Sequence, residues 1–261
     1  MSVHQPRVAL VTGATSGIGL AVARALATQG NQVFICARHD DAVRTTVQEL
    51  AGEGHQVDGT SCDVTSREDI GKVVRAAVDR FGPVDILVNN AGRSGGGITA
   101  DLADEVWYDV INTNLNSVFL MTREVLTTGG MRAKDRGRII NIASTAGKQG
   151  VVLGAPYSAS KHGVVGFTKA LGNELAPTGI TVNAVCPGYV ETPMASRVRQ
   201  GYAHAYNTTE AAILAKFQAK IPLGRYSSPE EVAGLVCYLA TDTAASITAQ
   251  AINVCGGLGN F

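Results

Sequence analysis

Short runs of β-branched residues alternate with longer amphipathic stretches along the whole chain, and this alternation limits the possible folds. The short runs are expected to be strands: Arg7–Thr12, Gln32–Ala37, Val57–Cys62, Val84–Asn89, Gly137–Ala143, Thr181–Cys186 and Ala251–Val254. The stretches between them carry apolar residues at helical spacing: Leu20–Gln29, Asp41–Gly52, Ser66–Phe81, Glu105–Leu126, Ser158–Pro177 and Pro229–Leu239. Nearly continuous apolar strands separated by helices predict an α/β fold, a doubly wound parallel sheet with helices on both faces.

The chain contains no Pro/Ser-rich linker and no internal repeat, so we expect a single domain over residues 1–261. One long interruption, Glu191–Leu223, is polar and aromatic and is bounded by Pro193 and Pro222. A loop-plus-helix insertion of that length inside a compact domain is typical of a lid or a binding segment. We therefore expect a substrate-binding lid at about 191–223.

Charge and cysteine usage exclude several classes of function. Lys+Arg and Asp+Glu balance at 22 each, which predicts no overall attraction to nucleic acid or to an anionic membrane. No apolar run is long enough to span a bilayer, and the segment Met1–Pro6 does not resemble a signal peptide. The five cysteines are scattered without a CxxC pair, and the histidines show no metal-ligand spacing. The expectation is a cytoplasmic protein with reduced thiols and no metal site.

A glycine-rich turn follows the first expected strand and precedes the first expected helix. Its glycines permit a tight turn and the close approach of a pyrophosphate to the helix N-terminus. The spacing is GxxxGxG rather than the GxGxxG of the long-chain dehydrogenases. The turn therefore predicts a dinucleotide site that contains Thr12, Gly13, Thr15, Ser16, Gly17, Ile18 and Gly19.

The second expected strand ends in Arg38, about 20 residues beyond the glycines, where an NAD-specific site would place an acid. A guanidinium there can pair with the 2′-phosphate of NADP, which a carboxylate would repel. The alternative is that Arg38 is a solvated loop residue and that Asp40 or Asp41 selects the cofactor. The sequence favours NADP(H).

Two further strand ends are expected to contribute to the cofactor site. Asp63 and Val64 follow the third strand, where the Asp63 carboxylate can meet the adenine or can equally cap a turn. Asn90, Ala91 and Gly92 follow the fourth strand and place small residues and amides beside the cofactor. Turn chemistry is the alternative role of this second group, and both roles are compatible.

Tyr157 and Lys161 lie four residues apart on an expected helix and therefore share one of its faces. A tyrosine ordinarily titrates near pH ~10 and is a poor acid at neutrality. An adjacent ammonium stabilises the phenolate and is expected to lower the pKa of Tyr157, giving a usable proton donor. A lone pair of this kind is often only a surface tyrosine over a lysine stem, so the assignment depends on its neighbours.

Those neighbours are Ser144 and Asn114. Ser144 follows the fifth strand, where its hydroxyl can hold a substrate carbonyl oxygen or can cap a helix. Asn114 lies inside a helical pattern, where asparagine is a poor helix former. It is either simply exposed or organises water near Lys161.

These motifs together resemble the short-chain dehydrogenase/reductase family over nearly the whole chain. The TGxxxGxG turn, Asn90-Ala91-Gly92 and the YxxxK pair carry the resemblance, joined by Pro187-Gly188 and Thr192. The resemblance implies a seven-stranded Rossmann fold and a homo-oligomer, usually a tetramer. It implies four catalytic residues with Tyr157 as the general acid: Asn114, Ser144, Tyr157 and Lys161. It also implies that Lys161 binds the nicotinamide ribose, that Thr192 contacts the nicotinamide amide, and that Pro187, Gly188 and Val190 lie in the cofactor site.

Several segments are similar to one branch of that family, the ketoreductases of bacterial aromatic (type II) polyketide synthases. Two of them are 93–97 (RSGGG) and 144–151 (STAGKQGV). That branch has Pro-Gly-Gly where this chain has Ser94-Gly95-Gly96, a change that bears on stereochemistry more than on reaction type. The resemblance implies reduction of the C9 carbonyl of a poly-β-keto chain tethered by phosphopantetheine to acyl carrier protein. It also implies a substrate pocket formed by Gly95, Gly96, Ser144, Gln149, Val151, Tyr157, Tyr189, Met194 and Tyr202, although ordinary packing of the insertion is an equal alternative for its aromatic and methionine positions.

Two rival functions remain open at this point. The first is a 3-oxoacyl-carrier-protein reductase of fatty-acid synthesis, or a small-molecule alcohol dehydrogenase with the same core. The second is a non-catalytic NADP(H) sensor, because a fold alone does not establish a function. The set Asn114, Ser144, Tyr157 and Lys161 argues against the sensor.

Overall fold

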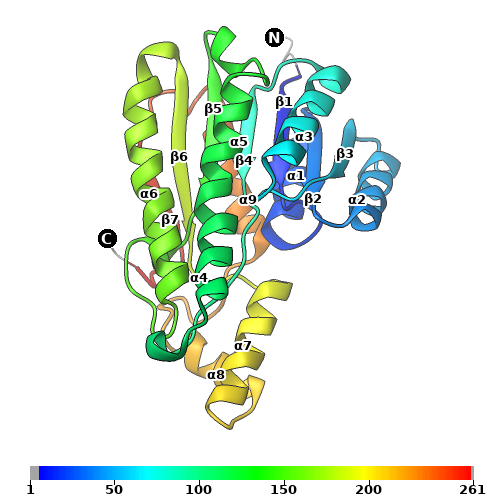
Figure 1. Ribbon diagram of the computed structural model, residues 1–261. Coiled ribbons are helices and arrows are strands. Elements are labelled where there is room, and N and C mark those ends of the chain that lie inside the picture. The colour runs from blue at the N-terminus through cyan, green and yellow to red at the C-terminus, as the bar shows by residue number, and fades with distance from the viewer. Residues whose placement is uncertain (1–5, 260–261) are drawn as a thin grey trace.

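The computed structural model describes residues 6–259, and within them seven parallel strands form one sheet with helices on both faces (Figure 1). The strand order is β3-β2-β1-β4-β5-β6-β7. The strands are β1 (Val8–Thr12), β2 (Gln32–Ala37), β3 (Val57–Ser61), β4 (Ile86–Asn89), β5 (Gly137–Ile142), β6 (Ile180–Pro187) and β7 (Ala251–Val254). This confirms the predicted doubly wound sheet. The order reverses between β1 and β4, and in such sheets ligands bind at that switch point.

The helices fill the connections between strands. The α-helices are α1 (Gly17–Thr28), α2 (Asp40–Gly52), α3 (Arg67–Phe81), α4 (Asp104–Ile111), α5 (Ser117–Leu126), α6 (Ala155–Leu175), α7 (Pro193–Ala205), α8 (Glu210–Gln218) and α9 (Pro229–Ala240). Single 3-10 turns occupy Thr99–Asp101, Met131–Ala133, Thr145–Gly147 and Ala176–Thr178. No helix of the described part of the chain is long and apolar enough to cross a membrane. The N-terminal residues 1–5, read above for a signal peptide, and residues 260–261 lie outside the described part.

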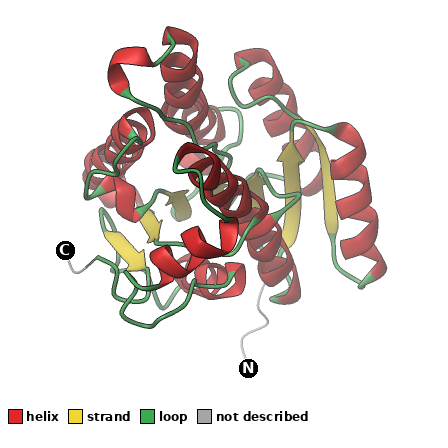
Figure 2. Cartoon of the chain, turned by 90° about the horizontal axis from the view of Figure 1, so that it is seen from below, coloured by secondary structure: helices red, strands yellow, loops and turns green. Residues whose placement is uncertain are grey.

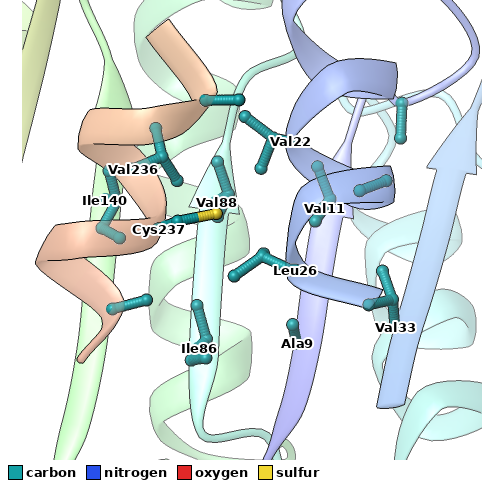
Figure 3. Packing of buried hydrophobic residues seen from close by; sticks show 14 of the residues in the cluster. Ala9, Val11, Val22, Leu26, Val33, Ile86, Val88, Ile140, Val236 and Cys237 are labelled. Atoms are coloured by element: carbon teal, nitrogen blue, oxygen red, sulfur yellow. The ribbon is translucent and has the colours of Figure 1, made fainter. Parts of the chain in front are cut away.

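Both faces of the sheet are buried, which explains why its strands read as continuous apolar runs. On one face, α1 and α9 pack over Val11 and Val88, with Val22, Leu26 and Val236 pointing from the helices onto the strands (Figure 3). On the other face, α3, α5 and α6 cover the alternate strand residues. Figure 2, seen from below, shows helices on both sides of the strands. The two layers hold the carboxyl ends of the strands in fixed relative positions.

The helix expected over Glu105–Leu126 is not continuous, so that prediction is wrong in this detail. Between α4 and α5 the chain forms a π-helical turn over Asn112–Asn116. Asn114 in this turn is fully buried. A π-turn inserts one extra residue and so rotates one side chain out of the regular helical pattern, frequently at a functional site. The turn directs Asn114 inward, away from the solvent-facing alternative.

The insertion after β6 contains two helices, α7 and α8, rather than a loop and one helix. In Figure 1 both lie below the carboxyl ends of the strands, apart from the sheet and its covering helices. The base of the insertion is closed by a bridge between Val190 and Ser227. The inner faces of α7 and α8 bury Ala203, Ile213 and Phe217 in a small apolar cluster of their own. The insertion therefore has its own packing and stands over the end of the sheet where ligands bind.

Candidate active site

Hydrogen bonds join the ends of β1 and β4 at the switch point. The Thr12 hydroxyl accepts from the backbone N–H groups of Asn90 (3.0 Å) and Ala91 (2.9 Å). In return the Asn90 amide donates to the carbonyl oxygens of Thr12 (2.9 Å) and Gly13 (3.0 Å). Asn90 therefore shapes the glycine-rich turn, which is the turn chemistry considered above. Ala91 and Gly92 follow directly beside it.

Two glycines of the glycine-rich turn, Gly13 and Gly19, have no room for a side chain. Gly13 has φ +64°, and a Cβ there would lie 2.9 Å from the Ala91 Cα. A Cβ on Gly19 would overlap the Asn90 amide and the Gly13 carbonyl oxygen. Helix α1 begins at Gly17, and its N-cap residue Ser16 makes no side-chain capping hydrogen bond. The Ser16 side chain therefore does not cap the first-turn N–H groups of α1. These N–H groups and the adjoining glycine-rich turn form a cradle that fits the pyrophosphate of a dinucleotide.

Arg38 lies at the end of β2, beside this turn, because the Gly13 N–H donates to the Cys36 carbonyl oxygen (2.7 Å). Its side chain is exposed. The carboxylates of Asp40 and Asp41, the alternative selectors of the cofactor, both pair with Arg44 on α2. Arg38 is thus the cation at this edge of the site that fits a 2′-phosphate.

Asp63 forms a turn at the end of β3. Its Oδ1 accepts from the Thr65 N–H (2.9 Å) and hydroxyl (2.8 Å). The Thr65 backbone hydrogen bond lowers the pKa of the Asp63 carboxyl, and the Thr65 hydroxyl and the nearby Arg38 charge lower it further. The turn role considered above is the one seen here, next to the buried Val64.

Three predicted catalytic side chains meet at the carboxyl ends of β5 and β6. Helix α6 begins at Ala155 and carries Tyr157 and Lys161 one turn apart. Ser144 lies two residues beyond the end of β5, and its hydroxyl is hydrogen-bonded to that of Tyr157. The Lys161 Nζ lies 5.8 Å from the centre of the Tyr157 ring and donates to the Ile142 carbonyl oxygen at 2.8 Å. The surface-pair alternative is therefore wrong, since Lys161 is only 5% exposed.

The pKa values at this cluster correct one expectation. Burial lowers the pKa of Lys161 to about 8. Burial raises the pKa of Tyr157, and the Ser144 hydrogen bond only partly opposes that rise. The expected lowering of the Tyr157 pKa by Lys161 is thus wrong for this structure, because desolvation of the phenolate is the dominant cause of the shift.

Asn114 is tied to the main chain of Arg93. Its Oδ1 accepts from the Arg93 N–H (2.8 Å) and its Nδ2 donates to the Arg93 carbonyl oxygen (2.9 Å). The same Nδ2 donates to the Ser160 hydroxyl (3.1 Å), which donates to the Tyr157 carbonyl oxygen (2.7 Å). The side chain thus holds a loop and a helix together. Ser160 was not among the predicted site residues. Its only signal in the sequence is its position as a small residue inside the YxxxK motif.

The loop that carries Gly95 and Gly96 packs tightly on its neighbours. A Cβ on Gly95 would overlap Val110, and one on Gly96 would overlap the Leu153 carbonyl oxygen. That oxygen also accepts the Gly97 N–H at 2.8 Å. The two glycines are therefore required by packing, whether or not a substrate touches them.

The remaining predicted substrate residues lie in the insertion and next to it, and in the segment that precedes α6. Tyr202 on α7 donates its hydroxyl to the Val152 carbonyl oxygen (3.0 Å), next to Val151. The Tyr189 ring instead stacks on Phe217 at 4.9 Å, in the aromatic packing of the insertion. Gln149 and Met194 are both half-buried, the first beyond the 145–147 turn and the second in the first turn of α7.

Thr192 links the insertion to the glycine-rich turn. It is the N-cap of α7, and its hydroxyl accepts from the Ala195 N–H at 3.2 Å. Its methyl group lies 3.1 Å from the position of a Cβ on Gly17. Upstream, the Gly188 N–H donates to the Val254 carbonyl oxygen (3.0 Å), which fixes the chain after Pro187. The segment after β6 therefore lies over the start of α1.

The low pKa of Lys161 predicts a pH-dependent contribution to stability. The unfolded chain holds the Lys161 proton up to about pH 10.5, whereas the folded protein releases it near pH 8. The free energy of unfolding should therefore gain about 1.4 kcal/mol per pH unit from this group between those pH values. We expect the stability of the wild type, measured by urea unfolding, to rise relative to Lys161→Met from pH 8 to 10. A pH-independent difference between the two proteins would contradict the assignment.

The matching family model is that of the short chain dehydrogenases, and it covers residues 7–203. The chain belongs to the short-chain dehydrogenase family. A Streptomyces virginiae protein named as a ketoacyl reductase of the monensin polyketide synthase is 75% identical to this family member over the whole of both chains. A granaticin polyketide synthase ketoacyl reductase of Streptomyces violaceoruber is 66% identical, over 97% of this chain and 93% of its own.

More distant members of the family include the 3-oxoacyl-[acyl-carrier-protein] reductase of Vibrio cholerae, 40% identical over 97% of both chains. Among solved structures, a variant of actinorhodin polyketide ketoreductase with NADPH matches with a TM-score of 0.96, 59% identity and complete coverage of both chains. The relatives whose names refer to polyketide synthesis are thus much more similar to this chain, at 59–75% identity, than the 3-oxoacyl-[acyl-carrier-protein] reductase at 40%.

Proposed function

We propose that this protein is an NADPH-dependent ketoreductase that reduces a carbonyl, at C9, of a carrier-protein-bound poly-β-keto intermediate in aromatic polyketide biosynthesis. The observation that carries the proposal is the meeting of Ser144, Tyr157 and Lys161 beside a cradle that fits a dinucleotide. Identities of 59–75% to proteins named as polyketide ketoreductases or as ketoacyl reductases of polyketide synthases, against 40% to a 3-oxoacyl-[acyl-carrier-protein] reductase, support the substrate class. Antibiotic biosynthesis is the corresponding biological role.

In the proposed reaction, bound NADPH supplies the hydride to the carbonyl carbon. Ser144 donates a hydrogen bond to the carbonyl oxygen, and Tyr157 delivers the proton to that oxygen as negative charge develops. The raised pKa of Tyr157 keeps its hydroxyl protonated until the hydride is transferred. Lys161 binds the nicotinamide ribose, and Asn114 holds the loop and helix on which the pair depends.

The proposed cofactor contacts follow the carboxyl ends of five strands. Arg38 meets the 2′-phosphate, and the first turn of α1 meets the pyrophosphate. The full set is Thr12, Gly13, Thr15, Ser16, Gly17, Ile18, Gly19, Arg38, Asp63, Val64, Asn90, Ala91, Gly92, Tyr157, Lys161, Pro187, Gly188, Val190 and Thr192.

The proposed substrate lies between the insertion and the loop after β4. Its wall comprises Gly95, Gly96, Gln149, Val151, Tyr189, Met194 and Tyr202, around Ser144 and Tyr157. We propose acyl carrier protein as the partner, a homotetramer as the assembly and the cytoplasm as the location. The residues at 191–223 then serve as the lid of a single domain.

Relative rates with two ketones test the substrate class. We expect NADPH oxidation to be faster with a fused bicyclic ketone than with an acetoacetyl thioester, and much slower with NADH than with NADPH. A fused ring mimics a cyclised polyketide, so the enzyme should recognise its shape. Preference for the linear thioester would favour a fatty-acid reductase, and tight NADPH binding without turnover of any ketone would favour a sensor.

A further inference from the structure

Arg199, on α7, is a buried cation outside the site described above. Only 6% of the residue is exposed. Burying a guanidinium is unfavourable unless its charge and its N–H groups are satisfied. Its two terminal nitrogens donate to the two carboxylate oxygens of Glu191 at 3.0 and 2.8 Å. This paired geometry fixes both side chains in direction as well as in distance.

A second carboxylate accepts from the third nitrogen of the same guanidinium. The Arg199 Nε donates to Glu210 Oε1 at 3.0 Å, and the Ser196 hydroxyl donates to that oxygen at 3.2 Å. The guanidinium also lies 5.4 Å from the centre of the Tyr226 ring. Arg199 therefore joins the segment before α7, the start of α8 and the segment that leaves the insertion.

The two carboxylates differ in what lies next to them. Glu191 directly precedes Thr192, whose methyl group lies over Gly17 of the glycine-rich turn. The Glu191 N–H is also bonded to the Ser227 carbonyl oxygen at 3.0 Å. Its backbone is thus held by Ser227 and its side chain by Arg199. Glu210 begins α8, and its side-chain partners among the described residues, Arg199, Ser196 and Gln200, all lie within the insertion.

We propose that Arg199, acting through Glu191, is a positioning residue that holds Thr192 against the cofactor site and so tightens the binding of NADPH. The Glu210 arm of the same arginine orders α8 and leaves the cofactor site unaffected. The inference rests on the proposed contact between Thr192 and the nicotinamide. A purely structural role for Arg199 would make the two carboxylates equivalent, because both pair with one guanidinium and both are partly exposed.

The test compares Glu191→Gln with Glu210→Gln, two isosteric changes that each remove one charge from the same ion cluster. We expect Glu191→Gln to raise the dissociation constant and the KM of NADPH by about 5- to 10-fold, with kcat within about twofold of the wild type. Glu210→Gln should leave both NADPH constants within about twofold. The dissociation constant is measured by the fluorescence of NADPH on titration with each protein, and circular dichroism checks that each is folded.

A double-mutant cycle shows whether the effect passes through Thr192. If it does, Glu191→Gln should add little to the dissociation constant of a Thr192→Ala protein, since coupled residues are non-additive. Equal shifts in the two glutamine variants, no shift in Glu191→Gln, or full additivity with Thr192→Ala would each overturn the inference. Should Glu191→Gln not fold, Arg199→Lys, which keeps the charge but cannot pair with both oxygens, takes its place in the same cycle.

Binding is measured without a ketone, so the inference and the proposed function fail separately. A protein that reduces no ketone but loses NADPH affinity on Glu191→Gln would refute the ketoreductase and keep the role of Arg199. If the protein reduces ketones but Glu191→Gln leaves the dissociation constant and the KM of NADPH unchanged, the ketoreductase proposal stands and the role of Arg199 is refuted.

Discussion

Replacing Tyr157 by phenylalanine is expected to lower the rate of ketone reduction by about 10²- to 10⁴-fold, the usual contribution of a positioned general acid. The change removes only the hydroxyl that is bonded to Ser144. The ring that lies 5.8 Å from the Lys161 Nζ remains. NADPH affinity should therefore change little while kcat falls. Initial rates of NADPH oxidation and a fluorescence titration of NADPH measure the two quantities.

Tyr238→Phe is the control for this variant. Tyr238 lies on α9 and is exposed, with no part in the proposed site. Its removal should leave the rate unchanged. A Tyr157→Phe protein with more than about a tenth of the wild-type kcat would show that another group, or water, delivers the proton.

Replacing Arg38 by alanine is expected to raise the KM for NADPH by about 10- to 100-fold, in line with the loss of a charged hydrogen bond. The KM for NADH, which has no 2′-phosphate, should change by less than about twofold. The ratio of kcat/KM values for the two cofactors, measured with one ketone, reports the change. The selectivity for NADPH over NADH should fall because the attraction between Arg38 and the 2′-phosphate is lost, while the rest of the cofactor site stays intact.

Arg80→Ala provides a matched loss of a surface arginine. Arg80 pairs with Asp58 on β3, the edge strand of the sheet, which is separated from β1 by β2. Arg80→Ala should leave the KM for NADPH and the KM for NADH unchanged. Equal losses of NADPH and NADH affinity in Arg38→Ala would instead mean that Arg38 supports the fold of the cofactor site. Unchanged selectivity for NADPH over NADH would mean that Asp40 or Asp41, and not Arg38, selects the cofactor.

The sequence predicted the sheet well because the pattern of each strand is local. All seven expected strands are present, and the glycine-rich turn lies between β1 and α1 as its spacing required. The catalytic cluster was also predictable, because Ser144 follows a strand and the other two residues share a helical turn. Parallel strands bring such ends to one edge of the sheet.

The features that were missed depend on contacts between distant segments. The π-turn at Asn114 forms where that side chain meets the main chain of Arg93, 21 residues earlier. The raised pKa of Tyr157 depends on burial, which a helical spacing does not report. The role of Glu191 depends on Arg199, and glutamate and arginine eight residues apart are not neighbours on a regular helix.

A chain of hydrogen bonds runs from the Arg93 main chain through Asn114 and Ser160 to the Tyr157 carbonyl oxygen, and it fixes two parts of the candidate active site relative to each other. The loop that would seat the ketone and the helix that bears the proton donor are joined by side-chain hydrogen bonds of 2.7–3.1 Å. A displacement of the loop relative to the start of α6 would have to break these hydrogen bonds. None of these hydrogen bonds involves the insertion, so the distance between a bound carbonyl and its proton donor is expected to depend on this loop–helix tie and not on the position of α7 and α8.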